Sequence, residues 1–237
     1  AENIFYYDDV VSYNYLVVGK IDIDSADTIS AYAAYLGLGG LKYVSNENIY
    51  VATYDYQSNQ KVNIFGWASN SSSFVTQTRI VKINFSSLKP TAAAKIEGTI
   101  KDRYSIDEYD GYLRVAATTR SNGSFSRVYV LASDLSLSGL IDNIAPGERI
   151  YSVRFNGTTG SLVTFRQVDP YFNLDLSDPK NPKISKGLKE DGVSHYIHYI
   201  GDTSYPIGVG RMSEEQGQGV KWTGLKVSLY DNSSGEA

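Results

Sequence analysis

The sequence contains no cysteine, only two histidines, and no apolar stretch approaching the roughly 20 residues that a membrane-spanning helix requires. Without cysteine the chain has no disulfide bonds, no cysteine–zinc sites and no thiol catalysis. Its formal net charge of −4 argues against nucleic acid and anionic membranes as partners, because both attract basic surfaces. Walker, Rossmann, HExxH and lipase-type motifs are also absent. We therefore expect no cofactor, no metal and no insertion into a membrane.

Residues 149–189 carry the clearest structural pattern. Tyr151, Val153 and Phe155 alternate with polar residues, as in a half-buried strand. Residues 156–160, Asn-Gly-Thr-Thr-Gly, form a predicted hairpin turn, since Asn and Gly tolerate the positive φ that such turns need. Two further strands follow, separated by the turn at residues 178–182. A four-stranded meander of this length is typical of one blade of a β-propeller.

The same unit recurs along the chain, with second strands expected to begin near Ile49, Tyr112, Ser161 and Tyr205. The later intervals match the repeat length of propeller blades, and the first is lengthened by a predicted polar loop over residues 55–77. A further loop is predicted over residues 211–218. We predict an all-β fold of four-stranded antiparallel blades in a single domain or fragment. The expected blades cover residues 1–40 (partial), 41–100, 101–145, 146–190 and 191–237 (partial). A β-sandwich is the alternative, because turns between alternating runs fit it too.

The ends of the chain do not complete a ring in this scheme. The segment before Gly37 holds too few strands for a blade, and residues 231–237 are too polar and short for a last strand. We expect an incomplete propeller of about four to five blades. It would be either an open arc or an assembly in which chains pair through their exposed blade edges.

One segment interrupts the strand pattern. Ile29, Tyr32, Ala33 and Leu36 follow helical spacing, Asp27 could cap the first turn and Gly37 could end the last. The spacing predicts a short helix from Thr28 to Leu36. A further strand is the alternative, because the segment is short and tyrosine suits either state.

Two longer motifs carry a resemblance to a known family. They are YSIDEYDGYLRVAATT, at residues 104–119, and GERIYSVRFNGTTGSLVTFRQVDPYFNLDLSDPKNPK, at residues 147–183. With these, the chain from about Leu41 onward resembles the secreted C-terminal β-propeller family distantly related to WD40 repeats. The resemblance implies an extracytoplasmic prokaryotic propeller with no established activity, so it assigns no catalytic residues. Members of that family look longer than this chain.

Acidic residues cluster at two predicted turns. Asp107, Glu108 and Asp110 could serve acid–base chemistry or hold Ca²⁺, but an Asp110-Gly111 hairpin turn with solvated neighbours explains them better. Asp175 and Asp178 fit turns in which a side-chain oxygen accepts backbone N–H groups. His195 and His198, three residues apart in a predicted strand, would point to opposite faces, which disfavours a shared zinc site.

A candidate ligand site combines arginines with an aromatic loop. Connections from successive blades open on one face of a propeller, where arginine can grip carboxylates or glycans. Trp67, with Phe65 and Phe74, lies in the long polar segment, where an aromatic side chain could dock a ligand or cover its own blade. The predicted ligand-binding residues are Trp67, Arg120, Arg166, Gln167 and Arg211. Ion pairs between blades, such as Arg166 with Asp169, are the alternative for the arginines, and Arg154 shares the same setting.

These observations favour a binding role over a catalytic one. We expect an extracellular or cell-surface module that recognises protein or glycan, because no catalytic constellation stands out. The alternative is a hydrolase or lyase with a carboxylate-lined channel. Twenty tyrosines and many Ser and Asn residues suit a secreted protein. Asn-x-Ser/Thr sequons, which also arise by chance in Ser-rich chains, occur at Asn70, Asn84, Asn122, Asn156 and Asn232.

Overall fold

The computed structural model describes residues 3–7, 13–25, 28–58, 74–120, 123–165, 169–201, 203, 205–216 and 219–232. Over these residues the chain forms nineteen strands and two single-turn 3₁₀ helices. None of the helical segments in this described part has the length or apolar character needed to span a bilayer. The prediction of an all-β fold is confirmed.

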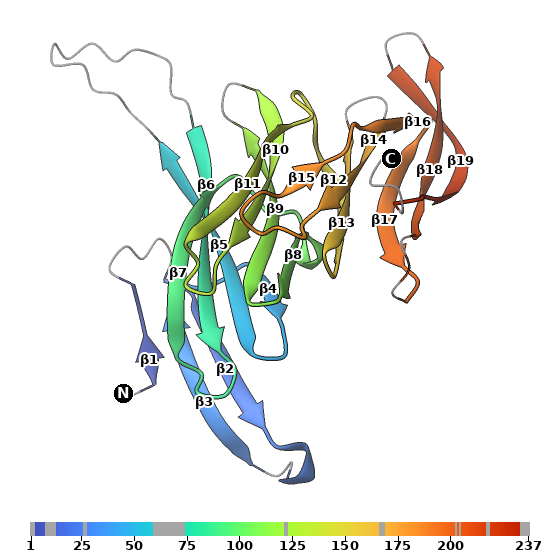
Figure 1. Cartoon of the computed structure of the whole chain (residues 1–237). Helices are drawn as coiled ribbons and strands as arrows, with labels where there is room; N and C mark the ends of the chain where they lie inside the picture. Colours follow the sequence, from blue (N-terminus) through green and yellow to red (C-terminus); the bar gives the residue numbers. More distant parts are fainter. Residues whose placement is uncertain are drawn as a thin grey trace, which may run out of the picture.

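The strands form five separate sheets in chain order (Figure 1). The first sheet holds β1 (Ile4–Phe5), β2 (Tyr15–Ile21) and β3 (Ile29–Leu36), and the helix η1 (Ile23–Ser25) connects β2 to β3. The second holds β4 (Leu41–Val44), β5 (Asn48–Ser58), β6 (Phe74–Asn84) and β7 (Pro90–Glu97). The helix η2 (Arg103–Ser105) leads into the third, with β8 (Ile106–Tyr109), β9 (Tyr112–Arg120), β10 (Ser124–Leu131) and β11 (Leu137–Ile144).

The fourth sheet holds β12 (Arg149–Asn156), β13 (Thr159–Phe165), β14 (Asp169–Asp175), β15 (Lys183–Ile184) and β16 (Leu188–Glu190). The fifth holds β17 (Val193–Tyr199), β18 (Pro206–Gln216) and β19 (Gly219–Leu229). Consecutive strands within these two sheets pair antiparallel, except that β15 and β16 both pair with β14.

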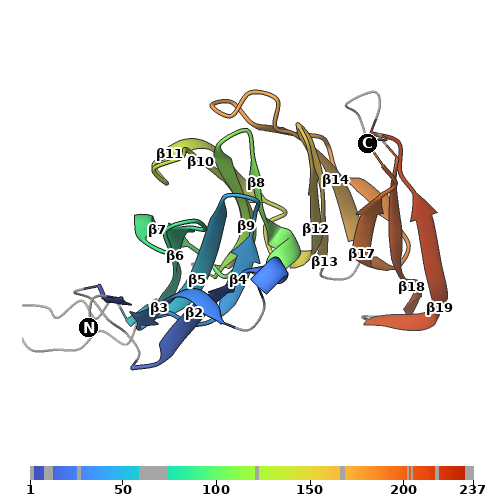
Figure 2. The same cartoon turned by 90° about the horizontal axis from the view of Figure 1, so that it is seen from below.

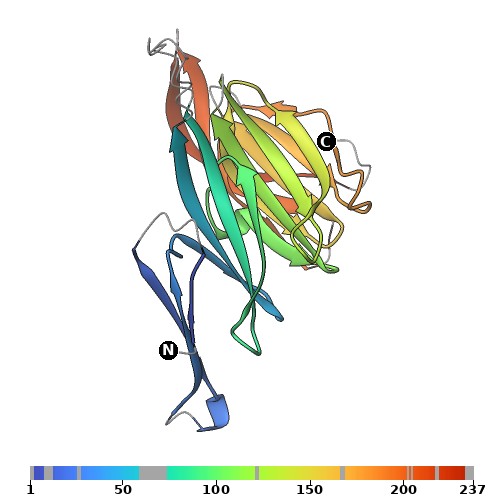
Figure 3. The ribbon, with the colours of Figure 1, turned by 90° about the vertical axis from the view of Figure 1, so that its left-hand side faces the viewer.

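The sheets follow one another along an open arc. Figure 2 shows the first strands β4, β8, β12 and β17 nearest the centre of the arc, with β7, β11 and β19 toward its outside. The arc does not close, as expected for an incomplete propeller. The ribbon of β2 and β3 reaches beyond the ends of the other sheets (Figure 3). We use the term channel side for the inner surface that the first strands line.

Apolar residues fill each space between neighbouring sheets. In β5, Ile49 and Val51 face the first sheet, whereas Tyr50 and Ala52 face the third. This alternation buries both faces of a middle sheet, so the four consecutive residues from Ile49 to Ala52 are all buried and apolar or aromatic. The two end sheets each bury one face only, and on the outer face Val17 and Val227 are both 65% exposed.

The segment Ile29–Leu36 is a strand, so the predicted helix from Thr28 to Leu36 is wrong. Ala33 and Tyr35 are buried, whereas Tyr32 is exposed and Ala34 and Leu36 are half-buried, which is a period of two and not a helical face. The strand pairs antiparallel with β2, and the Tyr35 hydroxyl donates to the Leu88 carbonyl oxygen at 2.6 Å. Burial raises the pKa of Tyr35 to about 12.

Two predicted loops are also shorter than expected. β5 and β6 pair from Asn48 with Asn84 as far as Ser58 with Phe74. Both ends of the predicted polar loop, residues 55–58 and 74–77, therefore belong to strands. Similarly, β18 and β19 pair as far as Gln216 with Gly219, where residues 211–218 were expected to be irregular. Residues 55–58 and 213–216 are mostly polar, so no apolar alternation marks them as strands in the sequence.

Candidate ligand-binding site on the channel side

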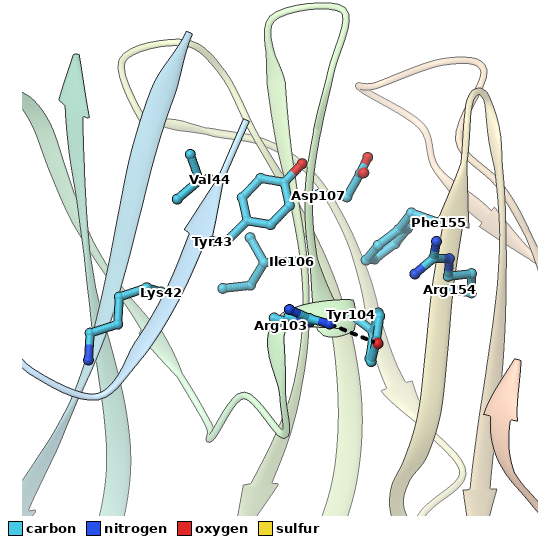
Figure 4. A pocket seen from close by; sticks show the side chains of 9 residues that line it. All are labelled: Lys42, Tyr43, Val44, Arg103, Tyr104, Ile106, Asp107, Arg154 and Phe155. Carbon is cyan, nitrogen blue, oxygen red and sulfur yellow. Dashed lines mark hydrogen bonds between the residues drawn. The ribbon is translucent and has the colours of Figure 1, made fainter. Parts of the chain in front are cut away.

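A cavity of about 400 Å³ opens on the channel side where the second, third and fourth sheets meet (Figure 4). Strands β4, β8 and β12 and the helix η2 supply its walls. We call it the channel pocket. It is lined by Lys42, Tyr43, Val44, Arg103, Tyr104, Ile106, Asp107, Arg154 and Phe155.

Two arginines flank one tyrosine ring in this pocket. The guanidinium of Arg103 lies 5.1 Å from the centre of the Tyr104 ring, and that of Arg154 lies 5.2 Å from it. Arg103 also donates to the Tyr104 hydroxyl at 3.2 Å. Among the residues that the structure describes, Arg154 forms no hydrogen bond or ion pair. Its donors are therefore open to a ligand.

The local fold fixes Tyr104 between these cations. Asp102 caps η2, because its carboxylate accepts the Tyr104 N–H at 3.0 Å and the Ser105 hydroxyl at 3.3 Å. The Tyr104 ring also meets the Tyr196 ring edge-on, with centroids 5.8 Å apart. The ring is thus held from the third sheet and the fifth together.

The one carboxylate that lines the channel pocket, Asp107, is already paired. It forms an ion pair with the buried Arg114, which also donates to the Gly157 carbonyl oxygen. The Arg114 guanidinium lies over the rings of Tyr109 and Phe155, at 5.0 and 5.3 Å. Asp107 therefore leaves the positive charge of Lys42, Arg103 and Arg154 uncompensated.

A second cavity, of about 280 Å³, lies at the other end of β12. We call it the histidine pocket, lined by Thr99, Lys101, Thr118, Arg120, Arg149, Ile150, Tyr151 and His195. Arg149 donates to the Tyr151 hydroxyl at 3.1 Å and lies over its ring at 5.3 Å. The His195 ring lies 5.5 Å from the Tyr151 ring. Burial, and then the charges of Arg211 and Lys101, lower the pKa of His195 below its usual value.

The predicted site residues fall in two groups. Arg120 lines the histidine pocket, and Arg211 is close enough to act on His195 electrostatically. Trp67, Arg166 and Gln167 lie outside the described residues, as does Phe65. The predicted binding face therefore stays a prediction. Sequence reasoning considered Arg154 but missed Lys42, Arg103 and Tyr104. The only local signal was arginine adjacent to a tyrosine just before a first strand.

The acidic clusters have structural roles. Asp110 and Gly111 adopt φ values of 50° and 76°, which confirms the hairpin turn. Glu108 is not solvated as expected: Asn48 and Tyr50 of the second sheet donate to it at 2.8 and 2.7 Å. A carboxylate that accepts from the neighbouring sheet holds the two sheets together.

The remaining candidates for metal binding also have other partners. Asp175 accepts the Ser177 N–H at 3.1 Å, and Asp178 accepts the Lys180 N–H at 2.9 Å, as in the predicted turns. His198 stacks on Tyr196 whereas His195 contacts Tyr151, so the two histidines do not converge. Over the part of the chain that the structure describes, no group of three His, Cys, Asp or Glu side chains could hold a metal.

The sheets and their order define a β-propeller. The chain matches the family described as Beta propeller domain over residues 1–235, and it belongs to that family. The match begins well before Leu41, where the sequence resemblance was expected to start.

Two archaeal relatives match about two thirds of the sequence. An uncharacterised protein of Archaeoglobus fulgidus is 43% identical over 157 residues, which cover 66% of this chain and 23% of that protein. An uncharacterised protein of Methanocaldococcus jannaschii is 39% identical over 159 residues, covering 65% of this chain and 24% of that protein. The chain thus spans less than a quarter of the length of these relatives. Membership of the family defines the fold and leaves the function to be argued from the site.

Proposed function

We propose that this chain is a ligand-binding module of an extracellular or cell-surface protein, and that the channel pocket holds an anionic group of its ligand. The proposal rests on the pair of guanidinium groups around Tyr104. Arginine presents a planar fork of donors that matches a carboxylate, and aromatic stacking leaves the edge of that fork available. The Arg154 guanidinium lies over the Tyr104 ring in this way, and its N–H groups remain able to donate to a ligand.

The channel pocket favours binding over catalysis. A hydrolase or lyase would need an acid, a base or a metal near the ligand. The single carboxylate among the lining residues, Asp107, is paired with Arg114. Without a second carboxylate beside it, the pocket lacks the pair of carboxylates that a hydrolase or lyase with a carboxylate-lined channel would use.

Galacturonate is a suitable probe, because it carries a carboxylate on a pyranose ring. We expect it to shift NMR signals around Tyr104 and to bind more tightly than galactose, the neutral sugar of the same shape. Arg154→Ala should weaken galacturonate binding about tenfold or more, since a hydrogen bond to a charged group contributes about 1.5–3 kcal/mol. The matched control is Lys180→Ala, which removes an exposed cation from the β14–β15 turn. Equal binding of both sugars, or equal effects of both variants, would contradict the proposal.

The proposed location rests on the abundance of Tyr, Ser and Asn in the sequence. It is tested separately by treating intact cells of the source organism with a protease that cannot cross the membrane. Loss of the full-length protein from intact cells is expected, and complete protection would place the protein inside the cell.

A further inference from the structure

We infer that the ligand is a linear acidic polysaccharide that lies along β12 and occupies the channel pocket and the histidine pocket together. This inference rests on the proposed function, because one of its two contacts is the channel pocket. To the proposed function it adds a second contact, the histidine pocket, and a class of ligand, the acidic polysaccharides.

The two pockets share their walls. The segment from Thr99 to Tyr104 contributes Lys101 to the histidine pocket and Arg103 with Tyr104 to the channel pocket. Strand β12 contributes Arg149 at one end and Arg154 near the other. Since a strand rises about 3.3 Å per residue, these two arginines are separated by roughly 16 Å along it. That span suits several linked sugar units and exceeds a single one.

Aromatic rings line the route between the pockets. The registers of β12 and β17 shift at Tyr151 and His195, and these two irregularities bring the rings of Tyr151 and His195 within 5.5 Å of each other. Tyr196, the next residue of β17, contacts Tyr104 in the channel pocket. Rings with an apolar face and a polar edge suit pyranose sugars, which have apolar faces and hydroxyl edges.

The route is strongly cationic although the chain as a whole carries a net charge of −4. Lys42, Arg103 and Arg154 surround the channel pocket, and Arg120 and Arg149 line the histidine pocket with Arg211 nearby. The nearest carboxylate on the shared segment, Asp102, pairs with Lys101 at 2.9 Å. A ligand with repeated negative charges would find an unpaired cation at both ends of the route.

A polysaccharide fits this route better than an acidic peptide does. An extended peptide would need a strand edge on which to pair its own N–H and C=O groups. The edge of β12 is interrupted, because the Ile150 N–H donates to the Thr118 hydroxyl at 3.1 Å. The Ser152 hydroxyl beside it donates to the Ser194 carbonyl oxygen at 2.7 Å, which ties β12 to β17.

The test compares galacturonate with oligogalacturonates of increasing length by isothermal titration calorimetry. In the wild-type protein, affinity should rise tenfold or more from the monomer to the hexamer, as a second contact forms within one complex. Arg149→Ala should remove most of that gain. Arg154→Ala should weaken the binding of both the monomer and the oligomers, whereas Lys180→Ala should change neither affinity. Thermal melting checks that each variant is folded, and Arg120→Ala provides a second variant of the histidine pocket.

The outcomes separate the two proposals. If the monomer binds in an Arg154-dependent manner but length brings no gain, or the gain survives in both Arg149→Ala and Arg120→Ala, the further inference is wrong and the proposed function stands. If neither monomer nor oligomer responds to Arg154→Ala, the proposed function fails. Equal or tighter binding of a poly-glutamate peptide, or of a single-stranded oligonucleotide of matched charge, would overturn the assignment to a polysaccharide.

Discussion

Replacing Glu108 by alanine should loosen the contact between the second and third sheets. The Glu108 carboxylate on β8 accepts from the Asn48 amide at 2.8 Å, from the Tyr50 hydroxyl at 2.7 Å and from the Ser45 hydroxyl. The ammonium of Lys82 lies 3.8 Å away, and both charged side chains are nearly buried, at 12% and 11% exposed. The variant would leave the Asn48 amide and the Tyr50 hydroxyl without this acceptor, and would leave the Lys82 ammonium with the Ser133 carbonyl oxygen, at 3.1 Å, but no carboxylate.

The expected loss is about 3–5 kcal/mol of unfolding free energy, the usual cost of removing one partner from a buried charged pair. For a chain of this size each kcal/mol shifts the melting temperature by about 2–4 °C, so a decrease of about 6–20 °C should appear by differential scanning calorimetry. Glu47→Ala is the matched control, because Glu47 is exposed in the adjacent β4–β5 turn and its loss should change the free energy by less than about 0.5 kcal/mol. A loss below about 1 kcal/mol for Glu108→Ala would refute the account of this network.

Three further predictions concern the ends of the arc and single side chains. The outer face of the fifth sheet exposes Val227 and Leu229, at 65% and 69%, and this face resembles those that pack between sheets inside the chain. A second copy should dock there, so light scattering should show association that Val227→Lys with Leu229→Lys reduces; a monomeric wild type would contradict this. Because the pKa of His195 is lowered in the folded state, the free energy of unfolding should decrease as the pH drops below about 6.5. In urea melts, His195→Gln should make this decrease smaller. An equal dependence on pH in the variant and the wild type would contradict the prediction. The Asn232 sequon should stay unmodified in a glycosylating host, since its buried amide donates to the Tyr199 hydroxyl at 3.2 Å; a glycopeptide at Asn232 in mass spectrometry would disprove this.

The architecture was largely predictable because its signals are local. The Asp110-Gly111 turn forms where its residue types allow positive φ, and alternation within each unit marks the strands between turns. The segment from Ile29 to Leu36 was misread because apolar residues occur on both of its faces, as they do at an end sheet with an exposed apolar side. The β5–β6 and β18–β19 ladders were predicted too short for the opposite reason, since residues 55–58 and 213–216 are mostly polar and carry no apolar alternation.

The candidate site was much less predictable. Lys42, Tyr104 and Arg154 lie in β4, η2 and β12, and nothing in their immediate sequence indicates that they share a cavity. These side chains come together only because successive sheets pack closely. That packing is set by the apolar residues between the sheets and not by the residues of the site. Arg120 and Arg211 were predicted to share a face because the connections of neighbouring blades converge; Arg120 lines the histidine pocket and Arg211 lies near His195, and their binding role stays a prediction.

The most direct test of a binding role is a crystal structure of the protein soaked with galacturonate. The account predicts an ordered sugar in the channel pocket, with its carboxylate within hydrogen-bonding distance, about 2.7–3.2 Å, of the Arg154 guanidinium and its ring beside Tyr104. A sugar bound only outside the channel side, or a pocket that stays empty of sugar at saturating concentration, would contradict it.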